Sequence, residues 1–269
     1  MDIRSAAVAD LFYPGSKNDL ETLIFHALNK ARPALVPAPT QSLKAVIVPH
    51  AGYIYSGQTA AFAFASIIPA QIQHIILLGP SHRIAFRGMA VPDCDAFETP
   101  FGLVKIDHQR MQKALTHADV QINTAAHAQE HSLEVQLPFL QTVLDQFTLL
   151  PICIGSVEAG VVAQLIESFW YDDATLFVIS SDLSHFHSYQ EANTIDELSI
   201  NMILRQQANL NHEQACGATG INALLNIANK HHLKAQLLDY RNSGDTAGDK
   251  ERVVGYASIA FFDDVKNHA

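Results

Sequence analysis

Three short apolar runs, each typical of a buried strand, lead directly into a turn that carries a histidine. The turns read PHAGY, GPSH and SSDLSH, and they contain His50, His82 and His185. In open α/β sheets, functional groups gather beyond the carboxyl ends of the strands, and imidazole is the commonest metal ligand among neutral side chains. We therefore expect a shared functional site in which two of these histidines supply fixed vertices for a metal ion. For any one histidine taken alone, a loop residue hydrogen-bonded to the backbone is the simpler interpretation.

Cys216 is a candidate ligand of a second kind, because it stands in QACG just before a helical pattern. The free N–H groups and the dipole of a helix N-terminus favour thiolate over thiol, and a thiolate is a soft metal ligand. The alternative is a small buried core residue, which is what a free cysteine usually is. Cys94 and Cys153 have no such flanking sequence, and we expect both to be structural.

His131 and Glu134 open the segment EHSLEVQLPFL at a spacing that puts them on one face of a helix. Two roles are open for them. They either support the site from behind its ligands or, in the case of Glu134, complement the helix dipole from the first turn. We expect seven further histidines to be surface or loop residues: His108, His117, His127, His187, His212, His231 and His232.

The chain lacks the motifs of several large enzyme classes. It contains no P-loop, no GxGxxG after a strand, no GxSxG, no HExxH and no CxxC. Phosphate-cradling, dinucleotide-binding and serine-hydrolase functions therefore have no direct support in the sequence.

Apolar runs alternate with helical patterns along the chain, which is typical of an α/β protein. We expect strands over residues 43–49, 74–79, 88–92, 102–107, 148–154, 176–181, 233–240 and 253–262. We expect helices over residues 60–68, 108–117, 131–147 with a kink at Pro138, 157–169, 192–207 and 217–230. Continuously apolar strands imply a sheet covered on both faces. The prediction is a three-layer α/β/α fold with a central mixed sheet, and one domain over residues 1–269.

Composition narrows the function further. The formal net charge of -10 argues against sequence-independent binding to DNA or RNA, which needs clustered lysine and arginine. No stretch approaches the roughly 18 uninterrupted apolar residues of a membrane helix, and the N-terminus does not resemble a secretory signal. An odd, low count of three cysteines argues against a disulfide framework. We expect a cytoplasmic protein with no nucleic-acid or membrane partner.

Five sequence blocks, in order along the chain, resemble the Memo-like family, known in bacteria as AmmeMemoRadiSam system protein B. They are VPHAGYIYSG (48–57), LGPSHR (78–83), EHSLEVQLPFL (130–140), SSDLSHF (180–186) and ACGATGINALLN (215–226). That family is similar in fold to class III extradiol ring-cleavage dioxygenases, which are nonheme iron enzymes. The resemblance implies an extradiol-dioxygenase-like fold.

The resemblance also assigns roles to site residues. It implies that His50, His82 and Cys216 are metal ligands and that His185 lies across the site as an acid/base group. It further places Asp182 and His131 along the same cleft. A thiolate in place of the dioxygenases' carboxylate is a departure, and it makes iron or copper the favoured metals, with zinc as a further candidate. Tyr53 is in a position to orient substrate.

Three functions remain open at this stage. The first is a metal-dependent redox enzyme of the dioxygenase-like kind, with an open face for O₂ or substrate. The second is a noncatalytic protein whose cleft binds a small molecule or peptide, with AMMECR-type and radical S-adenosylmethionine proteins as partners. The third is a zinc hydrolase built on two histidines and one cysteine.

Overall fold

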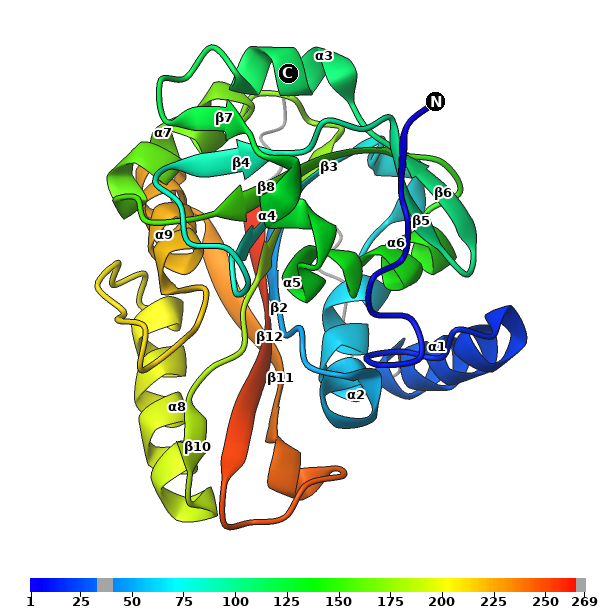
Figure 1. Ribbon diagram of the computed structural model, residues 1–269. Coiled ribbons are helices and arrows are strands. Elements are labelled where there is room, and N and C mark those ends of the chain that lie inside the picture. Colours follow the sequence, from blue (N-terminus) through cyan, green and yellow to red (C-terminus); the bar gives the residue numbers. More distant parts are fainter. Residues whose placement is uncertain (33–40, 265–269) are drawn as a thin grey trace.

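The computed structural model describes residues 1–32 and 41–264, and a mixed sheet forms its centre (Figure 1). Residues 33–40, where the sequence suggests a connection from the first helix to the first strand, lie outside the described part. Across the sheet the order is β10 (His185–His187), β12 (Val253–Asp264), β2 (Gln41–Val48), β9 (Thr175–Ser180), β3 (His74–Pro80), β8 (Thr148–Ile154), β4 (Met89–Val91) and β7 (Val120–Ile122). β11 (Lys234–Asn242) also pairs with β12.

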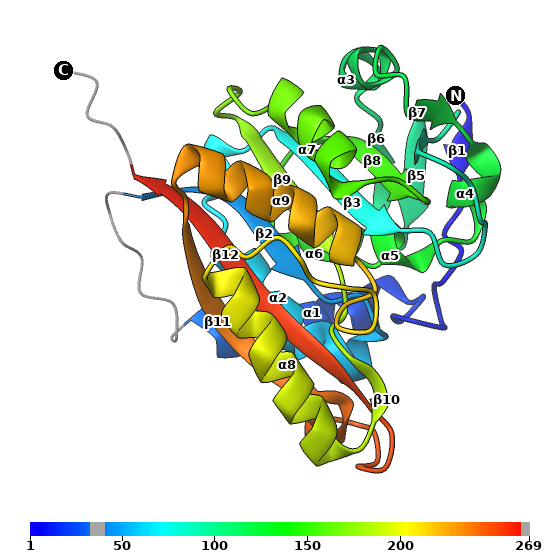
Figure 2. The same cartoon turned by 90° about the vertical axis from the view of Figure 1, so that its left-hand side faces the viewer.

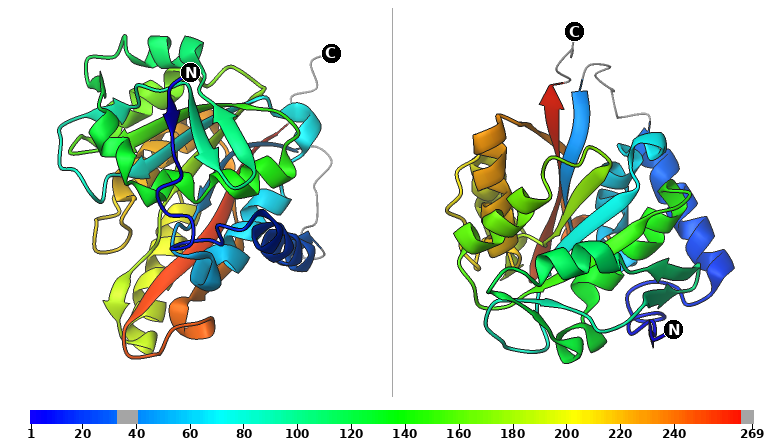
Figure 3. Two further views of the ribbon diagram at one scale, coloured as in Figure 1. Left: turned by 45° about the vertical axis from the view of Figure 1, so that its right-hand side comes forward. Right: turned by 90° about the horizontal axis from the view of Figure 1, so that it is seen from above.

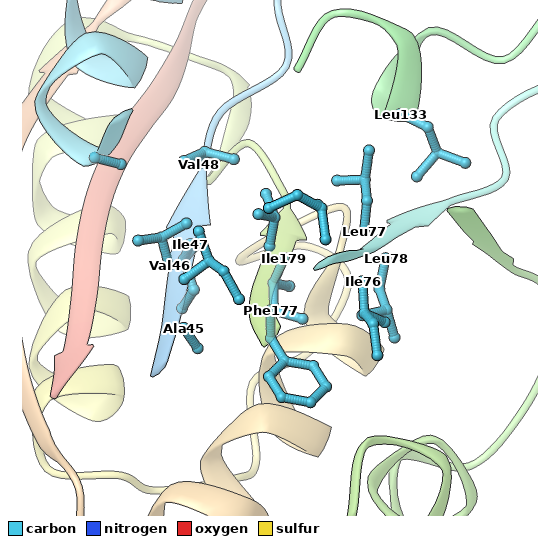
Figure 4. Packing of buried hydrophobic residues seen from close by; sticks show 14 of the residues in the cluster. Ala45, Val46, Ile47, Val48, Ile76, Leu77, Leu78, Leu133, Phe177 and Ile179 are labelled. Atoms are coloured by element: carbon cyan, nitrogen blue, oxygen red, sulfur yellow. The ribbon is translucent and has the colours of Figure 1, made fainter. Parts of the chain in front are cut away.

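The four strands β2, β9, β3 and β8 are parallel to one another. They are apolar along their length because helices cover both faces of the sheet. Figure 4 shows Ile47 of β2, Leu77 of β3 and Ile179 of β9 packed in this core, and each is at most 1% exposed. β12 runs antiparallel to β2, and β4 runs antiparallel to β8. The predicted mixed sheet is therefore confirmed.

Helices form a layer on each side of the sheet, as Figures 2 and 3 show for α9 on one face and α1 on the other. One layer contains α7 (Ala159–Ser168), α8 (Tyr189–Leu204) and α9 (Ala218–His231). The other contains α1 (Lys17–Ala31), α2 (Tyr53–Ala65), α5 (His131–Glu134) and α6 (Leu137–Val143). The three-layer α/β/α fold is confirmed, whereas the single-domain assignment stays a prediction.

A smaller sheet and two short helices complete the described part of the chain. The small sheet has the order β1 (Ile3–Arg4), β5 (Ala96–Thr99) and β6 (Gly102–Lys105). The short helices are α3 (His108–Ala114) and α4 (Thr124–Ala128). None of the helices in residues 1–32 and 41–264 is long and apolar enough to cross a lipid bilayer.

The helix expected over residues 131–147 is instead two helices, α5 and α6. Pro138 lies in the first turn of α6, where its missing N–H is not needed by the helix. The proline therefore starts a helix and does not kink one. This break matters for the site, because α5 is then a single turn that packs against β3 independently of α6.

Candidate metal centre

Three neighbouring parallel strands end at one edge of the sheet, and the predicted site residues follow these ends. β2 pairs with β9, and β9 pairs with β3, so His50, Asp182 and His82 lie beyond adjacent strand ends. α5 brings His131 to the same place. One ligand atom from each of the three histidines lies within 4.8 Å of the others. This group can hold a metal ion.

Ser180, at the end of β9, fixes the protonation of the His50 ring. Its hydroxyl donates to the carbonyl of Ser132 at 2.6 Å and accepts from the Nε2 amide of Gln136 at 2.9 Å. A hydroxyl has only one proton to give. The contact of 2.9 Å between Ser180 Oγ and His50 Nδ1 must therefore be donated by the ring. Burial lowers the pKa of His50 well below its usual range, so the ring is neutral and its Nε2 carries a lone pair that can accept a hydrogen bond or bind a metal.

Glu130 orients His82 as Ser180 orients His50, so that Nδ1 of the ring is the hydrogen-bond donor. Its Oε1 lies 2.9 Å from Nδ1 of His82, and its Oε2 accepts the backbone N–H of His82 at 2.6 Å. Burial raises the pKa of this carboxyl, but hydrogen bonds from His82 and Ser132 outweigh it and lower the pKa to about 2. A carboxylate only accepts, so His82 donates through Nδ1 and presents Nε2. Metal-binding histidines commonly have such a carboxylate partner.

His131 faces both of the other rings. Its ring centroid lies 5.3 Å from that of His50 and 4.6 Å from that of His82. On its other side Phe12 packs at 4.6 Å. Burial lowers the pKa of His131 to about 4, so this ring is also neutral. Its buried Nδ1 has no hydrogen-bond partner within the described chain, although Oε1 of Glu130 lies 3.3 Å away.

Cys216 reaches the group from the opposite layer, just before α9. Its Sγ lies 3.2 Å from Nε2 of His50 and 3.7 Å from the main-chain oxygen of Asp182. Burial, followed by the charge of Asp182, raises the pKa of the Cys216 thiol to about 12. Desolvation thus outweighs the effect of the helix N-terminus that was expected to favour a thiolate. Without a cation nearby, the side chain is a thiol.

Asp182 and His185 lie beside these residues. Oδ1 of Asp182 accepts the backbone N–H of His50 at 2.7 Å, and burial raises the pKa of this carboxyl to about 7. His185 is half-buried in β10, where the next residue, Phe186, has a left-handed φ of 62°. Burial lowers the pKa of His185, and His82 contributes to this effect. A neutral imidazole of this kind can accept a proton.

The family of the chain follows from a sequence comparison over nearly its full length. A family model described as Memo-like protein matches residues 4–260. The chain belongs to the Memo-like family. The matched range contains every site residue named above.

Relatives named as MEMO1 family proteins support this assignment. One from Aquifex aeolicus is 37% identical over 281 residues, with 97% of this chain and 100% of the relative covered. One from Nitrosopumilus maritimus is 34% identical over 277 residues, with 96% and 99% covered. A crystal structure of an uncharacterized protein from Escherichia coli K12 aligns with a TM-score of 0.53 at 12% identity, covering 80% of this chain and 99% of that one. This last likeness concerns the fold alone.

Two residues singled out in this Memo-like sequence have contacts that the sequence did not indicate. The hydroxyl of Tyr53 donates to the carbonyl of Val135 at 2.6 Å, and the side chain is buried. Its expected role with substrate stays a prediction. Glu134 is fully buried and binds Arg4 and Tyr13 of the N-terminal segment. Glu134 therefore holds the N-terminal segment in place. The sequence suggested support of the site or of the helix dipole, and this third role was not predicted.

The prediction that His127 is a surface or loop residue is wrong. It lies in α4, is 1% exposed, and contacts the carbonyl of Ala90 through Nε2 at 2.9 Å. Glu130 was not among the predicted site residues, although it directly precedes His131. The signal was available, because a carboxylate beside a candidate ligand is a common partner in metal sites.

The donor set fits a metal ion. His50 and His82 each turn Nε2 away from the buried partner of Nδ1, Nε2 of His50 lies 3.2 Å from the Cys216 thiol, and His131 has a buried nitrogen without a hydrogen-bond partner in the described chain. Buried polar atoms in native proteins are normally satisfied. A cation bound among the three imidazoles and the Cys216 thiol would give such an atom a partner. The Memo-like chain thus has a histidine group that can bind a metal.

Proposed function

We propose that this Memo-like chain is a redox protein that binds one iron or copper ion through His50, His82 and Cys216. The observation that carries the proposal is the common orientation of the two histidines. Each ring gives its Nδ1–H to a buried acceptor and leaves Nε2 as a metal ligand. The position of Cys216 Sγ, 3.2 Å from Nε2 of His50, supports the third ligand.

The donor types favour iron or copper, with zinc as a further candidate. Imidazole suits zinc, copper and iron, and a thiolate adds a soft ligand. When bound, the ion would supply redox or Lewis-acid chemistry to a substrate at an open coordination position. Cys216 would lose its proton on binding, because a coordinating thiol is deprotonated. His131 offers a fourth donor, a nitrogen beside the other two rings.

Asp182 and His185 are the proposed proton carriers. The buried carboxyl of Asp182 has a pKa of about 7, so it exchanges a proton at neutral pH. His185 would accept a proton from substrate at a ring nitrogen, as a general base does. The Tyr53 hydroxyl supports the site differently, because its bond to the Val135 carbonyl fixes the start of α2 next to α5.

The first test is the metal content of protein purified without oxygen and without affinity metal. The wild-type chain is compared by mass spectrometry with Cys216→Ala, with His131→Ala and with Cys94→Ala as a matched control. Cys94 is a buried cysteine outside the site. We expect near-stoichiometric iron or copper in the wild type and the control, and a large loss in Cys216→Ala. Loss of metal in His131→Ala as well would make His131 a fourth ligand.

The contrary result is little metal in every protein, even after reloading. It would overturn the metal function and favour a noncatalytic cleft. The protein would then be tested for binding to AMMECR-type and radical S-adenosylmethionine partner proteins. Zinc alone, with hydrolysis of an ester or amide panel, would favour the hydrolase.

A further inference from the structure

The N-terminal segment is attached to α5 by one buried carboxylate. Oε1 of Glu134 accepts the hydroxyl of Tyr13 at 2.6 Å and the backbone N–H of Val8 at 3.0 Å. Oε2 accepts the backbone N–H of Ala7 at 2.9 Å and Nη1 of Arg4 at 2.6 Å. Figure 1 shows this segment, in dark blue, passing in front of α6. A fully buried carboxylate with four donors holds its neighbours firmly in place.

Arg4 has two further contacts on the same short stretch. Its Nη2 donates to the main-chain oxygen of Glu130 at 2.9 Å, and its Nε donates to the main-chain oxygen of His127 at 2.7 Å. The side chain of Arg4 is 8% exposed. One planar guanidinium thus joins the end of α4, the residue before α5 and the last residue of α5. A guanidinium suits this task because its donors have a fixed fork geometry.

The residue held by Arg4 is also the residue that holds a proposed ligand. The side chain of Glu130 contacts both Nδ1 and the backbone N–H of His82. The same segment places Phe12 against the ring of His131. Two of the histidines therefore receive their orientation from groups that the N-terminal segment fixes.

We infer that Arg4 is a positioning residue of the metal centre, acting on His82 through Glu130. The inference rests on the proposed function, because it concerns affinity for the metal. α5 is a single helical turn, and a single turn has little intrinsic stability. Its place, and that of Glu130 before it, must come from tertiary contacts. Arg4 supplies two of these contacts, one to the main-chain oxygen of Glu130 and one to the carboxylate of Glu134.

The test compares cobalt(II) binding to the wild-type chain, Arg4→Lys and Arg110→Lys. A lysine at position 4 keeps a cation beside Glu134, so the protein is expected to fold, but one ammonium cannot reproduce the three-way contact. Arg110 is the matched control, because it too is a partly buried arginine held by carboxylate, in its case by Asp107 and Asp172. Both contacts lie outside the site.

We expect the dissociation constant for cobalt(II) to rise about tenfold in Arg4→Lys, the low end for loss of a group that orients a metal ligand. It should change less than about twofold in Arg110→Lys. The cobalt absorption bands should shift in Arg4→Lys alone. Unfolding of each metal-free protein is measured beside these values, so that binding is compared at equal fractions of folded chain.

A second comparison tests the route through Glu130. If Arg4 acts through this residue, Arg4→Lys combined with Glu130→Gln should weaken cobalt(II) binding no more than Glu130→Gln alone. Additive losses would overturn that route. Equal affinity of Arg4→Lys and the wild type would overturn the inference and leave the metal function intact. If the wild-type chain binds no cobalt(II), the proposed function itself fails.

Discussion

Single hydrogen-bonding groups determine what the histidines of the site can do. A histidine that follows a strand binds a metal only if the correct nitrogen keeps its lone pair. Ser180 settles this for His50, because its one proton goes to a carbonyl and its oxygen must accept from the ring. Glu130 settles it for His82. Chemistry at this site therefore depends on two residues that are not themselves ligands.

Ser180→Ala should weaken metal binding and also lower stability, because three buried groups lose their contact with Oγ. The alanine removes the acceptor for His50 Nδ1, so the ring loses its fixed tautomer and orientation. We expect the dissociation constant for the metal to rise about 10- to 100-fold, the range for loss of a partner of this kind. Competition with a chelator of known affinity measures it. Ser258→Ala is the control, since Ser258 is also a fully buried serine bonded to a carbonyl. Equal losses in both variants would contradict the prediction.

At the scale of elements, the approach of α9 to the end of β9 places Cys216. Gly217 lies between them, and a Cβ there would come within 2.7 Å of Ser181 Cβ and 2.8 Å of the Ser180 carbonyl oxygen. No side chain fits at these distances. A glycine at this position thus lets the thiol reach His50. Because glycine has no side chain, α9 can pack closely against the end of β9.

Gly217→Ala should push the start of α9 away from the sheet and carry Cys216 with it. We expect a loss of about 1–3 kcal/mol in the free energy of unfolding, as overpacked interiors show, together with weaker metal binding. Gly160→Ala serves for comparison, because a Cβ at that position in α7 meets nothing within 4 Å. That variant should gain about 0.5–1 kcal/mol from helix propensity. Denaturant titration measures the free energy of unfolding of both variants. A Gly217→Ala protein with the stability and metal affinity of the wild type would refute the prediction.

The elements differ in how well the sequence predicts them. The strands β2, β3, β8 and β9 were predictable, because a strand buried on both faces is a continuous apolar run. The split between α5 and α6 was not, since its apolar pattern fits one long helix equally well. Among the site residues, the histidines at the strand ends were predictable, because each follows an apolar run and a short turn. Arg4 and Phe12 could not be found this way, because their contacts join residues more than a hundred positions apart.

At the scale of the whole molecule, buried neutral histidines make stability depend on pH. Burial lowers the pKa of His127 to about 4, whereas the same residue in the unfolded chain titrates near 6.5. Between these values the unfolded chain binds a proton that the folded protein does not. Stability therefore falls as the pH drops from about 6.5 to 4, and this residue accounts for up to about 3 kcal/mol of the loss.

His127→Gln should flatten this acid-side decline. The glutamine amide can still donate to the Ala90 carbonyl that His127 Nε2 contacts, but it does not titrate. The free energy of unfolding, measured by denaturant titration between pH 7 and pH 4.5, should fall less steeply than in the wild type. Replacement of the exposed His26 by glutamine should leave the slope unchanged. If His127→Gln keeps the wild-type slope, the buried imidazole is not its source.

The place of β12 in the sheet has a consequence for synthesis on the ribosome. β12 follows every other strand of the large sheet in sequence, yet it lies directly against β2, with Ile259 opposite Ile47. Until residues 253–264 have emerged, the strand that leads to His50 has one edge open to other chains, which invites aggregation. The nascent protein cannot complete its sheet early. Pairing of β2 along both of its edges therefore has to follow synthesis of residues 253–264.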